Sequence, residues 1–155
     1  MDKEIKIRII KVVMLTMASV ALLSGGVIYL LFRPDSLYMF KWFTALKSLK
    51  HVFVQLPHVD LPDIMVYSLP DGLWLLSYIL IIGIIWDFQT KKCIAFLALM
   101  PFFSLFHELL QWLNLFGTFD IYDLFSYFCA TIIGLFIINI CNIIITNNYN
   151  YEKSI

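Results

Sequence analysis

The sequence predicts an all-α integral membrane protein, a bundle of four transmembrane helices with an extracytoplasmic amphipathic segment between the first two. Of its 155 residues, 61% are hydrophobic and only 14% are charged, whereas ordinary soluble domains are roughly 45–50% apolar and about 25% charged. A soluble domain of this size leaves too much of its surface in water to hide that apolar content. Four apolar stretches approach the roughly 20 residues that a bilayer requires. We therefore expect a single membrane domain over residues 1–155.

The predicted spans cover residues 9–32, 71–87, 93–116 and 121–146. The first follows a basic segment, which also allows a signal peptide, but its apolar core exceeds the roughly 7–15 residues usual in such peptides. An uncleaved helix is therefore favoured. The second is short, and Asp71 and Asp87 would lie at its two membrane interfaces. In the fourth, Ser126, Ala130 and Gly134 recur every four residues, which is typical of a surface where helices pack closely.

The long connection between the first two spans contains the predicted amphipathic helix. Apolar residues recur at three- to four-residue spacing over residues 37–53, as expected of a helix with one apolar face. Such a helix would lie in the outer headgroup region or pack over the outer mouth of the bundle, and both remain open. Pro57, Pro62 and Pro70 predict that the rest of the connection is not helical.

The distribution of basic residues predicts the orientation. With the N-terminus inside, the cytoplasmic segments hold Lys3, Lys6, Arg8, Lys11, Lys91, Lys92 and Lys153, and the outer segments hold Arg33, Lys41, Lys47 and Lys50. The positive-inside rule then places both termini in the cytoplasm. The formal net charge is zero, so no overall basic field indicates nucleic acid as a partner. The three cysteines are expected to be buried small hydrophobes rather than disulfide partners.

In this orientation, the polar residues of the spans gather near the outer side. We expect an outward-facing ligand pocket formed by Asp71, Trp74, Ser104, His107, Glu108, Gln111, Asp120 and Asp123. Glu108 is the most informative of these, because it lies about two turns inside the end of its predicted helix. A carboxylate at that depth is costly and usually faces a cavity or a partner. The alternative is a hydrogen bond that only joins two helices.

The aspartates also fit a structural role. Ser68 and Asp71 have the spacing of a capping box, and Asp120 and Asp123 can likewise cap the fourth helix. A capping carboxylate can still face a pocket, so both roles can coexist.

A metal site is not predicted, and neither is any other cofactor. The segment from His107 to Gln111 differs by one residue from the HExxH zinc motif. That motif needs two imidazoles four residues apart, and Gln111 replaces the second one. No catalytic residue can be assigned from a recognisable motif.

Two segments resemble the VanZ-like family of small bacterial membrane proteins. They are His107-Glu108-Leu-Leu-Gln111-Trp and Gly117-Thr-Phe-Asp120-Ile-Tyr-Asp123-Leu, followed by Gly134. Members typically carry Glu-x-x-Gln near the end of the third helix and Asp-x-x-Asp before a glycine-containing fourth. The start of the second helix is also similar, in Ser68-Leu-Pro-Asp71-Gly-Leu-Trp74.

The chain departs from the family pattern in its cations. Gly117 and Thr118 occupy the region of a common Arg, Tyr127 that of an Asn, and Trp74 that of a His, while the usual Lys of the second helix is missing. The family takes its name from low-level resistance to teicoplanin-type glycopeptides. The resemblance implies a multi-pass protein of the bacterial plasma membrane with a role near the outer leaflet or the cell envelope.

Three functions are considered. The first is a non-enzymatic cell-envelope protein whose pocket binds a membrane lipid, a lipid-linked intermediate or a glycopeptide antibiotic. The second is a small transporter or channel subunit, as a homo-oligomer, with Glu108 in proton or cation coupling. The third is an envelope-lipid enzyme with Glu108 or Asp71 as general acid or base. Polar groups confined to the outer half favour the first, since transporter sites usually lie near the bilayer midplane.

Overall fold

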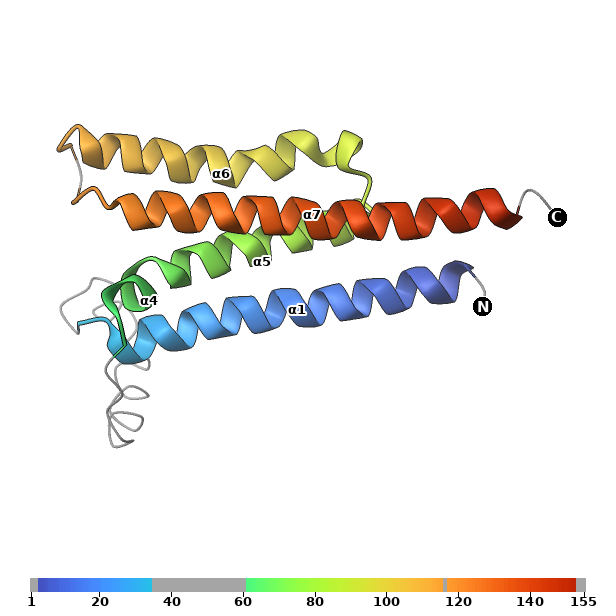
Figure 1. Ribbon diagram of the computed structural model, residues 1–155, viewed down its shortest axis with the longest axis horizontal. Coiled ribbons are helices and arrows are strands. Elements are labelled where there is room, and N and C mark those ends of the chain that lie inside the picture. The colour runs from blue at the N-terminus through green and yellow to red at the C-terminus, as the bar shows by residue number, and fades with distance from the viewer. Residues whose placement is uncertain (1–2, 35–60, 116, 153–155) are drawn as a thin grey trace.

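The computed structural model describes residues 3–34, 61–115 and 117–152, and this part of the chain is helical with no strand. Figure 1 shows the arrangement of its elements. In chain order they are α1 (Lys3–Phe32), α4 (Asp63–Tyr67), α5 (Leu69–Ile85), α6 (Thr90–Trp112) and α7 (Ile121–Glu152). The predicted all-α class is confirmed for the described residues. The amphipathic helix predicted over residues 37–53 lies outside them.

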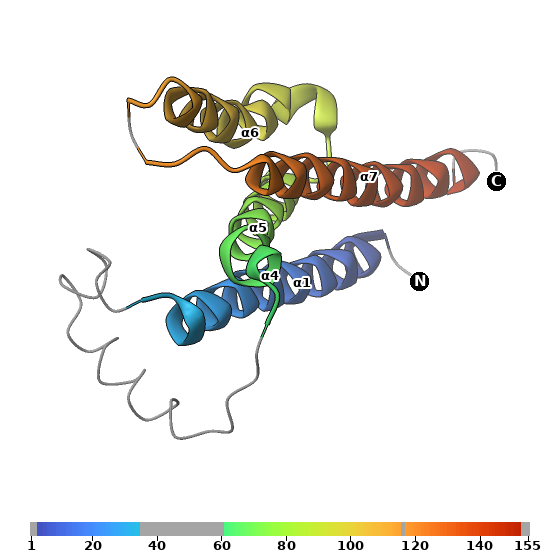
Figure 2. The same cartoon turned by 60° about the vertical axis from the view of Figure 1, so that its left-hand side comes forward.

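Helix α5 is the centre of the bundle. It packs against α1 on one side and against α6 and α7 on the other, while α1 and α7 touch only weakly. Figure 2 shows α5 between α1 and the α6–α7 pair. Residues all around α5 are buried, among them Leu75, Ile79 and Leu80, as expected of a helix that is apolar on every side.

Small residues let the helices approach closely. A Cβ at Gly134 of α7 would lie 2.7 Å from Cγ2 of Ile79, and a Cβ at Gly72 of α5 would lie 3.1 Å from Cβ of Ser126. Ala130, between these two contacts, is only 5% exposed. The predicted packing surface of α7 is therefore confirmed, and α5 is the helix that it contacts.

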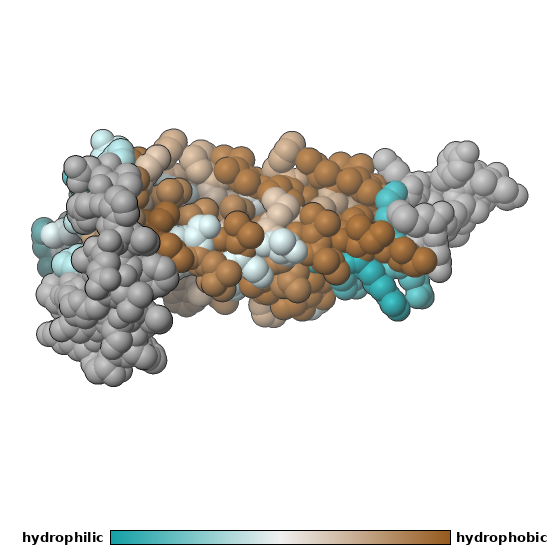
Figure 3. Space-filling model, turned by 90° about the horizontal axis from the view of Figure 1, so that it is seen from below, coloured by the Kyte–Doolittle hydropathy of each residue, from teal (hydrophilic) through white to brown (hydrophobic). Residues whose placement is uncertain are grey.

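The outer surface of the bundle is strongly apolar. Three helical segments among the described residues are long and apolar enough to cross a membrane: Glu4–Phe32, Thr90–Trp112 and Ile121–Thr146. On the face shown in Figure 3, hydrophobic residues cover most of the length, and hydrophilic residues gather toward the ends. Exposing so much apolar surface to water would be unfavourable, whereas the hydrocarbon core of a bilayer accommodates it. The chain is therefore a membrane protein.

Helix α5 is shorter, with 17 residues. It ends in a tight turn in which Asp87 and Phe88 have positive φ angles of 50° and 60°. The main-chain N–H of Phe88 donates to the Gly83 carbonyl oxygen (2.7 Å), and the Phe88 side chain is fully buried. That anchoring compensates a backbone conformation that costs a bulky residue roughly 1–2 kcal/mol. Beside the turn, Lys11 of α1 forms an ion pair with Asp87.

The prolines after residue 60 do not exclude helix, contrary to the prediction. Pro62 is the N-cap residue of α4, and Pro70 lies in the first turn of α5. In a first turn the missing N–H costs nothing, because that position has no partner within the helix. The prediction from proline content was therefore wrong for Pro62 and Pro70, while Pro57 lies outside the described residues.

The third predicted span ends earlier than expected. Helix α6 stops at Trp112, although the apolar run continues to residue 116. Asn114 adopts a positive φ of 57°, and the Leu115 N–H donates back to the Leu110 carbonyl oxygen (3.0 Å). This is the left-handed termination that asparagine tolerates well. Glu108 consequently lies about one turn from the end of its helix, not two.

Candidate functional site

One end of the bundle collects acidic side chains from three helices. Asp71 lies in the first turn of α5, Glu108 in the last turns of α6, and Asp123 in the first turn of α7. These three carboxyl groups interact electrostatically with one another. We call them the carboxyl cluster. They meet because α5 and α7 begin where α6 ends (Figure 1).

Glu108 is the most enclosed member of the cluster. Its side chain is only 1% exposed, although it lies on a helix whose other residues are mostly uncovered. The segment before α7 covers it, and the main-chain N–H of Asp120 faces its carboxyl group. A buried carboxyl group needs such partners, because burial without hydrogen bonds is costly. Tertiary packing, rather than depth along α6, buries this residue.

Gln111 connects Glu108 to its neighbours. In the amide orientation that satisfies all of them, Nε2 donates to Glu108 Oε2 (3.2 Å) and to the Thr118 carbonyl oxygen (2.8 Å), and Oε1 accepts from His107 Nδ1 (3.2 Å). Gly117 passes close by with φ of +72°, where a Cβ would lie 3.3 Å from the Gln111 side-chain amide. Gln111 thus holds the connection between α6 and α7 against Glu108.

The capping predictions have different outcomes. Asp120 caps α7, because its Oδ1 accepts from the Tyr122 main-chain N–H (2.9 Å). The Ser68 side chain makes no capping bond at the start of α5, so that prediction was wrong. Instead, its hydroxyl is directed at the Asp123 carboxyl group. Apart from this contact, the buried atoms Ser68 Oγ and Asp123 Oδ1 have no hydrogen-bond partner within the described residues.

Arg33 brings a cation to this end of the bundle, which sequence reasoning did not include in the site. It follows α1 directly and interacts electrostatically with Asp71 and Asp123. Its Nη2 donates to the Tyr67 carbonyl oxygen (2.9 Å), and its guanidinium lies over the rings of Tyr29 and Tyr67. Arg33 directly follows the first predicted span, which ends on the same side of the membrane as the predicted pocket. That position could have indicated that Arg33 belongs to the site.

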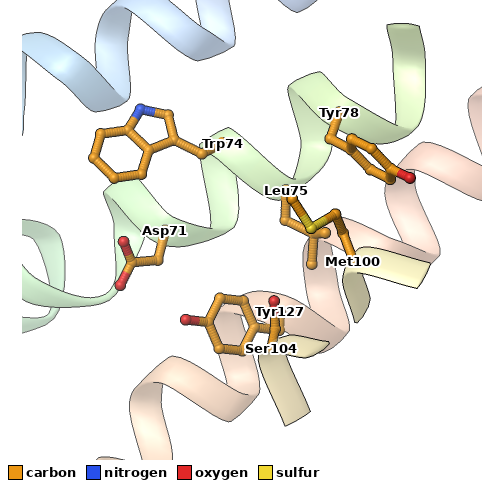
Figure 4. A pocket seen from close by; sticks show the side chains of 7 residues that line it. All are labelled: Asp71, Trp74, Leu75, Tyr78, Met100, Ser104 and Tyr127. Carbon is orange, nitrogen blue, oxygen red and sulfur yellow. The ribbon is translucent and has the colours of Figure 1, made fainter. Parts of the chain in front are cut away.

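A cavity of about 210 Å³ lies beside the cluster, between α5, α6 and α7. Its lining residues, shown in Figure 4, are Asp71, Trp74, Leu75, Tyr78, Met100, Ser104 and Tyr127. Asp71 and the Tyr127 hydroxyl lie toward one end, and Tyr78 and Met100 toward the other (Figure 4). Since Asp71 and Tyr78 are seven residues apart on α5, the cavity spans about 10 Å along that helix. Its lining therefore changes from polar to mostly apolar.

The predicted pocket residues divide into three groups. Asp71 and Ser104 line the cavity with polar groups. Trp74 lines it as a wall, because its Nε1–H donates to the Leu22 carbonyl oxygen of α1 (3.2 Å) and points toward α1 in Figure 4. The remaining five do not line this cavity: His107, Glu108, Gln111, Asp120 and Asp123.

Glu108 borders a second hollow on the α6–α7 surface. This hollow of about 250 Å³ is lined by Leu105, Glu108, Leu109, Trp112, Phe119 and Leu124. Apart from Glu108, every side chain around this hollow is apolar, so Glu108 contributes the single carboxyl group of its lining.

Tyr127 and Tyr78 are cavity residues that sequence reasoning missed. Tyr127 interacts electrostatically with all three members of the carboxyl cluster, and its position one helical turn after Asp123 was a usable signal. The Tyr78 hydroxyl donates to the Phe96 carbonyl oxygen (2.7 Å) and so joins α5 to α6 near Pro101, a proline inside α6. Nothing in the sequence pairs Tyr78 with that carbonyl.

The acidic residues at this end form no recognisable metal site within the described ranges. Among the described residues, no three His, Cys, Asp or Glu side chains are close enough to coordinate one. What the arrangement does offer is several hydrogen-bond acceptors, one cation and an adjoining cavity. These features fit the recognition of a small-molecule group better than ion coordination.

No protein-family model, curated protein or solved structure matches this chain significantly.

Proposed function

We propose that this protein is a non-enzymatic cell-envelope factor of the VanZ-like type, which binds an amphipathic molecule in the cavity beside the carboxyl cluster. The occupant is a membrane lipid, a lipid-linked envelope intermediate or a glycopeptide antibiotic. One observation carries the proposal: the cavity changes from polar at Asp71 and Tyr127 to mostly apolar at Met100 within about two helical turns. An amphipathic ligand has the same division.

The proposed orientation in a bacterial plasma membrane places the cluster outside and both termini in the cytoplasm. Lys11, Lys91 and Lys92 lie at the end opposite the carboxyl cluster, around the Asp87 turn. Basic residues favour the cytoplasmic side. With 17 residues, α5 is about 25 Å long, short for a span, but its central position shields it from lipid on most sides. We therefore propose four spans.

Reporter fusions test this topology. Fusions after Lys92 and at the C-terminus are expected to behave as cytoplasmic, and fusions between Pro57 and Pro62 as external. An external C-terminus would remove the outward orientation of the cavity and with it a role at the outer leaflet.

Binding is tested by filling the cavity. Ser104→Phe places an aromatic ring in the lining, and Leu99→Phe adds similar bulk on a face of α6 that is 46% exposed. Full-length protein is purified in mild detergent, and its retained lipids are quantified by mass spectrometry. We expect wild type and Leu99→Phe to retain a lipid at near one-to-one ratio and Ser104→Phe to lose it. Equal retention by the two variants would contradict the proposal.

Burial of Glu108 favours one alternative, a proton- or cation-coupled transporter. A carboxyl group that is 1% exposed inside an apolar bundle is typical of coupling sites. Reconstitution in liposomes with a pH-sensitive dye distinguishes the two. Proton flux that depends on Glu108 supports transport, and its absence together with one-to-one lipid retention supports binding.

A further inference from the structure

We infer that the occupant of the cavity is a bilayer lipid that enters sideways from the membrane, with its chain along α5 between α1 and α6. This inference rests on the proposed function and names its ligand class. The polar group of the lipid would lie in the cavity. Its chain would continue toward the inner end of α5.

One row of side chains on α5 is open to the membrane. Four residues recur at three- to four-residue spacing and therefore share one face of that helix: Trp74, Tyr78, Ile81 and Ile85. We call these four residues the α5 strip. Ile81 is 36% exposed and Ile85 is 65% exposed, although α5 is the central helix of the bundle (Figure 2). Along the strip, lipid therefore reaches the centre of the bundle.

Helices α1 and α6 border the strip. The Trp74 Nε1–H donates to the Leu22 carbonyl oxygen of α1 (3.2 Å), and the Tyr78 hydroxyl donates to the Phe96 carbonyl oxygen of α6 (2.7 Å). Among the described helices, α1 and α6 form no extensive contact with each other. Two neighbouring side chains of the strip thus reach both of its borders. The strip is therefore narrow at this level, about one row of residues wide.

The strip is continuous with the cavity. Trp74 and Tyr78 belong to both, and the cavity has Asp71 at its other end (Figure 4). Ile85 follows Trp74 by eleven residues, which is about 16 Å along the helix axis. The hydrocarbon core of a bilayer is about 30 Å thick, so the chains of one leaflet span about 15 Å. A lipid with its polar group in the cavity has a chain of the length that the strip accommodates.

A lipid chain fits the strip better than other occupants do. Beyond Tyr78 the strip consists of Ile81 and Ile85, so a polar molecule that arrives from water finds no hydrogen-bonding side chain there. A helix of a second copy is about 10 Å wide, whereas the strip is one row of residues wide where Trp74 and Tyr78 bridge it. A lipid chain reaches the strip from neighbouring chains, so its entry exposes no apolar surface to water. Entry from the side is therefore favoured over entry from the outer surface.

The test places an aromatic ring in the strip outside the cavity. Full-length wild type, Ile81→Trp and Ser104→Phe are purified in mild detergent, and retained lipids are quantified by mass spectrometry. Ile132→Trp is the matched control, because Ile132 is 51% exposed on α7 and lines neither the cavity nor the hollow beside Glu108. We expect wild type and Ile132→Trp to retain lipid at near one-to-one ratio. Ile81→Trp should retain at least about fivefold less, because the added bulk opposes the chain.

The variants separate this inference from the proposed function. Equal retention by Ile81→Trp and Ile132→Trp, with loss in Ser104→Phe, would overturn the chain assignment and leave binding in the cavity intact. Full retention by Ser104→Phe would overturn both. Native mass spectrometry of the same samples reports the oligomeric state. A wild-type dimer that becomes a monomer in Ile81→Trp would show that a second copy covers the strip, and the inference would then be wrong.

A photochemical label locates the chain without any substitution, and carries the test if size-exclusion profiles show that Ile81→Trp does not fold. Wild type is reconstituted in vesicles of phosphatidylethanolamine and phosphatidylglycerol. A small share of both lipids carries a diazirine, either near the headgroup or at the chain end. After extraction, only retained lipid remains to be crosslinked. We expect the chain-end label on α5 around Ile81 and Ile85, and the other label around Ser104. Chain-end labelling centred on Trp112 would contradict the inference.

Discussion

Gly134→Ala perturbs a close contact between α5 and α7. The new Cβ would lie 2.7 Å from Cγ2 and 3.1 Å from Cβ of Ile79, a side chain that is fully buried. Distances below 3.0 Å do not occur for real Cβ atoms. Ile79 is branched at Cβ and therefore has little freedom to rotate within a helix. The two helices have to separate by a few tenths of an ångström.

The expected cost follows from two opposing terms. Inserting a methyl group into a packed interface typically costs about 1–3 kcal/mol, whereas replacing a helical glycine by alanine can gain up to about 1 kcal/mol. Gly26→Ala is the matched control, because a Cβ at Gly26 has nothing within 4 Å. The propensity term is common to both variants. The free energy of unfolding should therefore be about 1–3 kcal/mol lower for Gly134→Ala than for Gly26→Ala.

The measurement is reversible unfolding by SDS in mixed micelles, followed by circular dichroism and tryptophan fluorescence. A double-mutant cycle with Ile79→Ala isolates the contact. Once Ile79 is truncated, Gly134→Ala should cost no more than Gly26→Ala. Equal stabilities of the two glycine variants, within about 0.5 kcal/mol in the wild-type background, would refute this packing argument.

Three further outcomes are expected. Glu108→Gln should stay folded, because the amide keeps the volume and hydrogen-bonding capacity. It should lose function, measured as the lipoglycopeptide susceptibility of a sensitive host at equal protein level. The same susceptibility as with the wild-type protein would exclude catalysis and proton coupling. Tyr78→Phe removes the bond to the Phe96 carbonyl oxygen and should lower the free energy of unfolding in SDS titrations by about 0.6 kcal/mol, with Tyr29→Phe as control. Lys11→Gln breaks a partly exposed ion pair with Asp87 and should cost less than about 1 kcal/mol; a larger loss, or one insensitive to salt, would contradict this.

Composition and local pattern were sufficient for the class of protein. The share of apolar residues predicts a membrane protein, and three helices long and apolar enough to span a bilayer agree with it. Four-residue spacing of Ser126, Ala130 and Gly134 predicts a close-packing surface, and Gly134 meets Ile79 there. Asp120 caps α7 as its position indicates. These features depend on neighbours within one or two turns, which is why the sequence reveals them.

Other local predictions failed where several conformations suit the same residues. Pro62 and Pro70 were read as helix breakers, but proline is compatible with a first turn. The apolar run to residue 116 suggested a longer third span, yet Asn114 ends α6 through its left-handed conformation. A run of apolar residues indicates which segment lies in the membrane, but it does not indicate the residue at which the helix ends.

The sequence by itself determined that acidic residues would gather at one end, since Asp71, Glu108 and Asp123 all lie near predicted helix ends on the same side. Only the tertiary structure decided how they meet. It buries Glu108 beneath the start of α7, turns the Trp74 N–H toward α1, and adds Arg33 and Tyr127 to the site. The rotation of each helix about its axis and its depth relative to its neighbours result from packing between segments distant in sequence, and no local pattern encodes them.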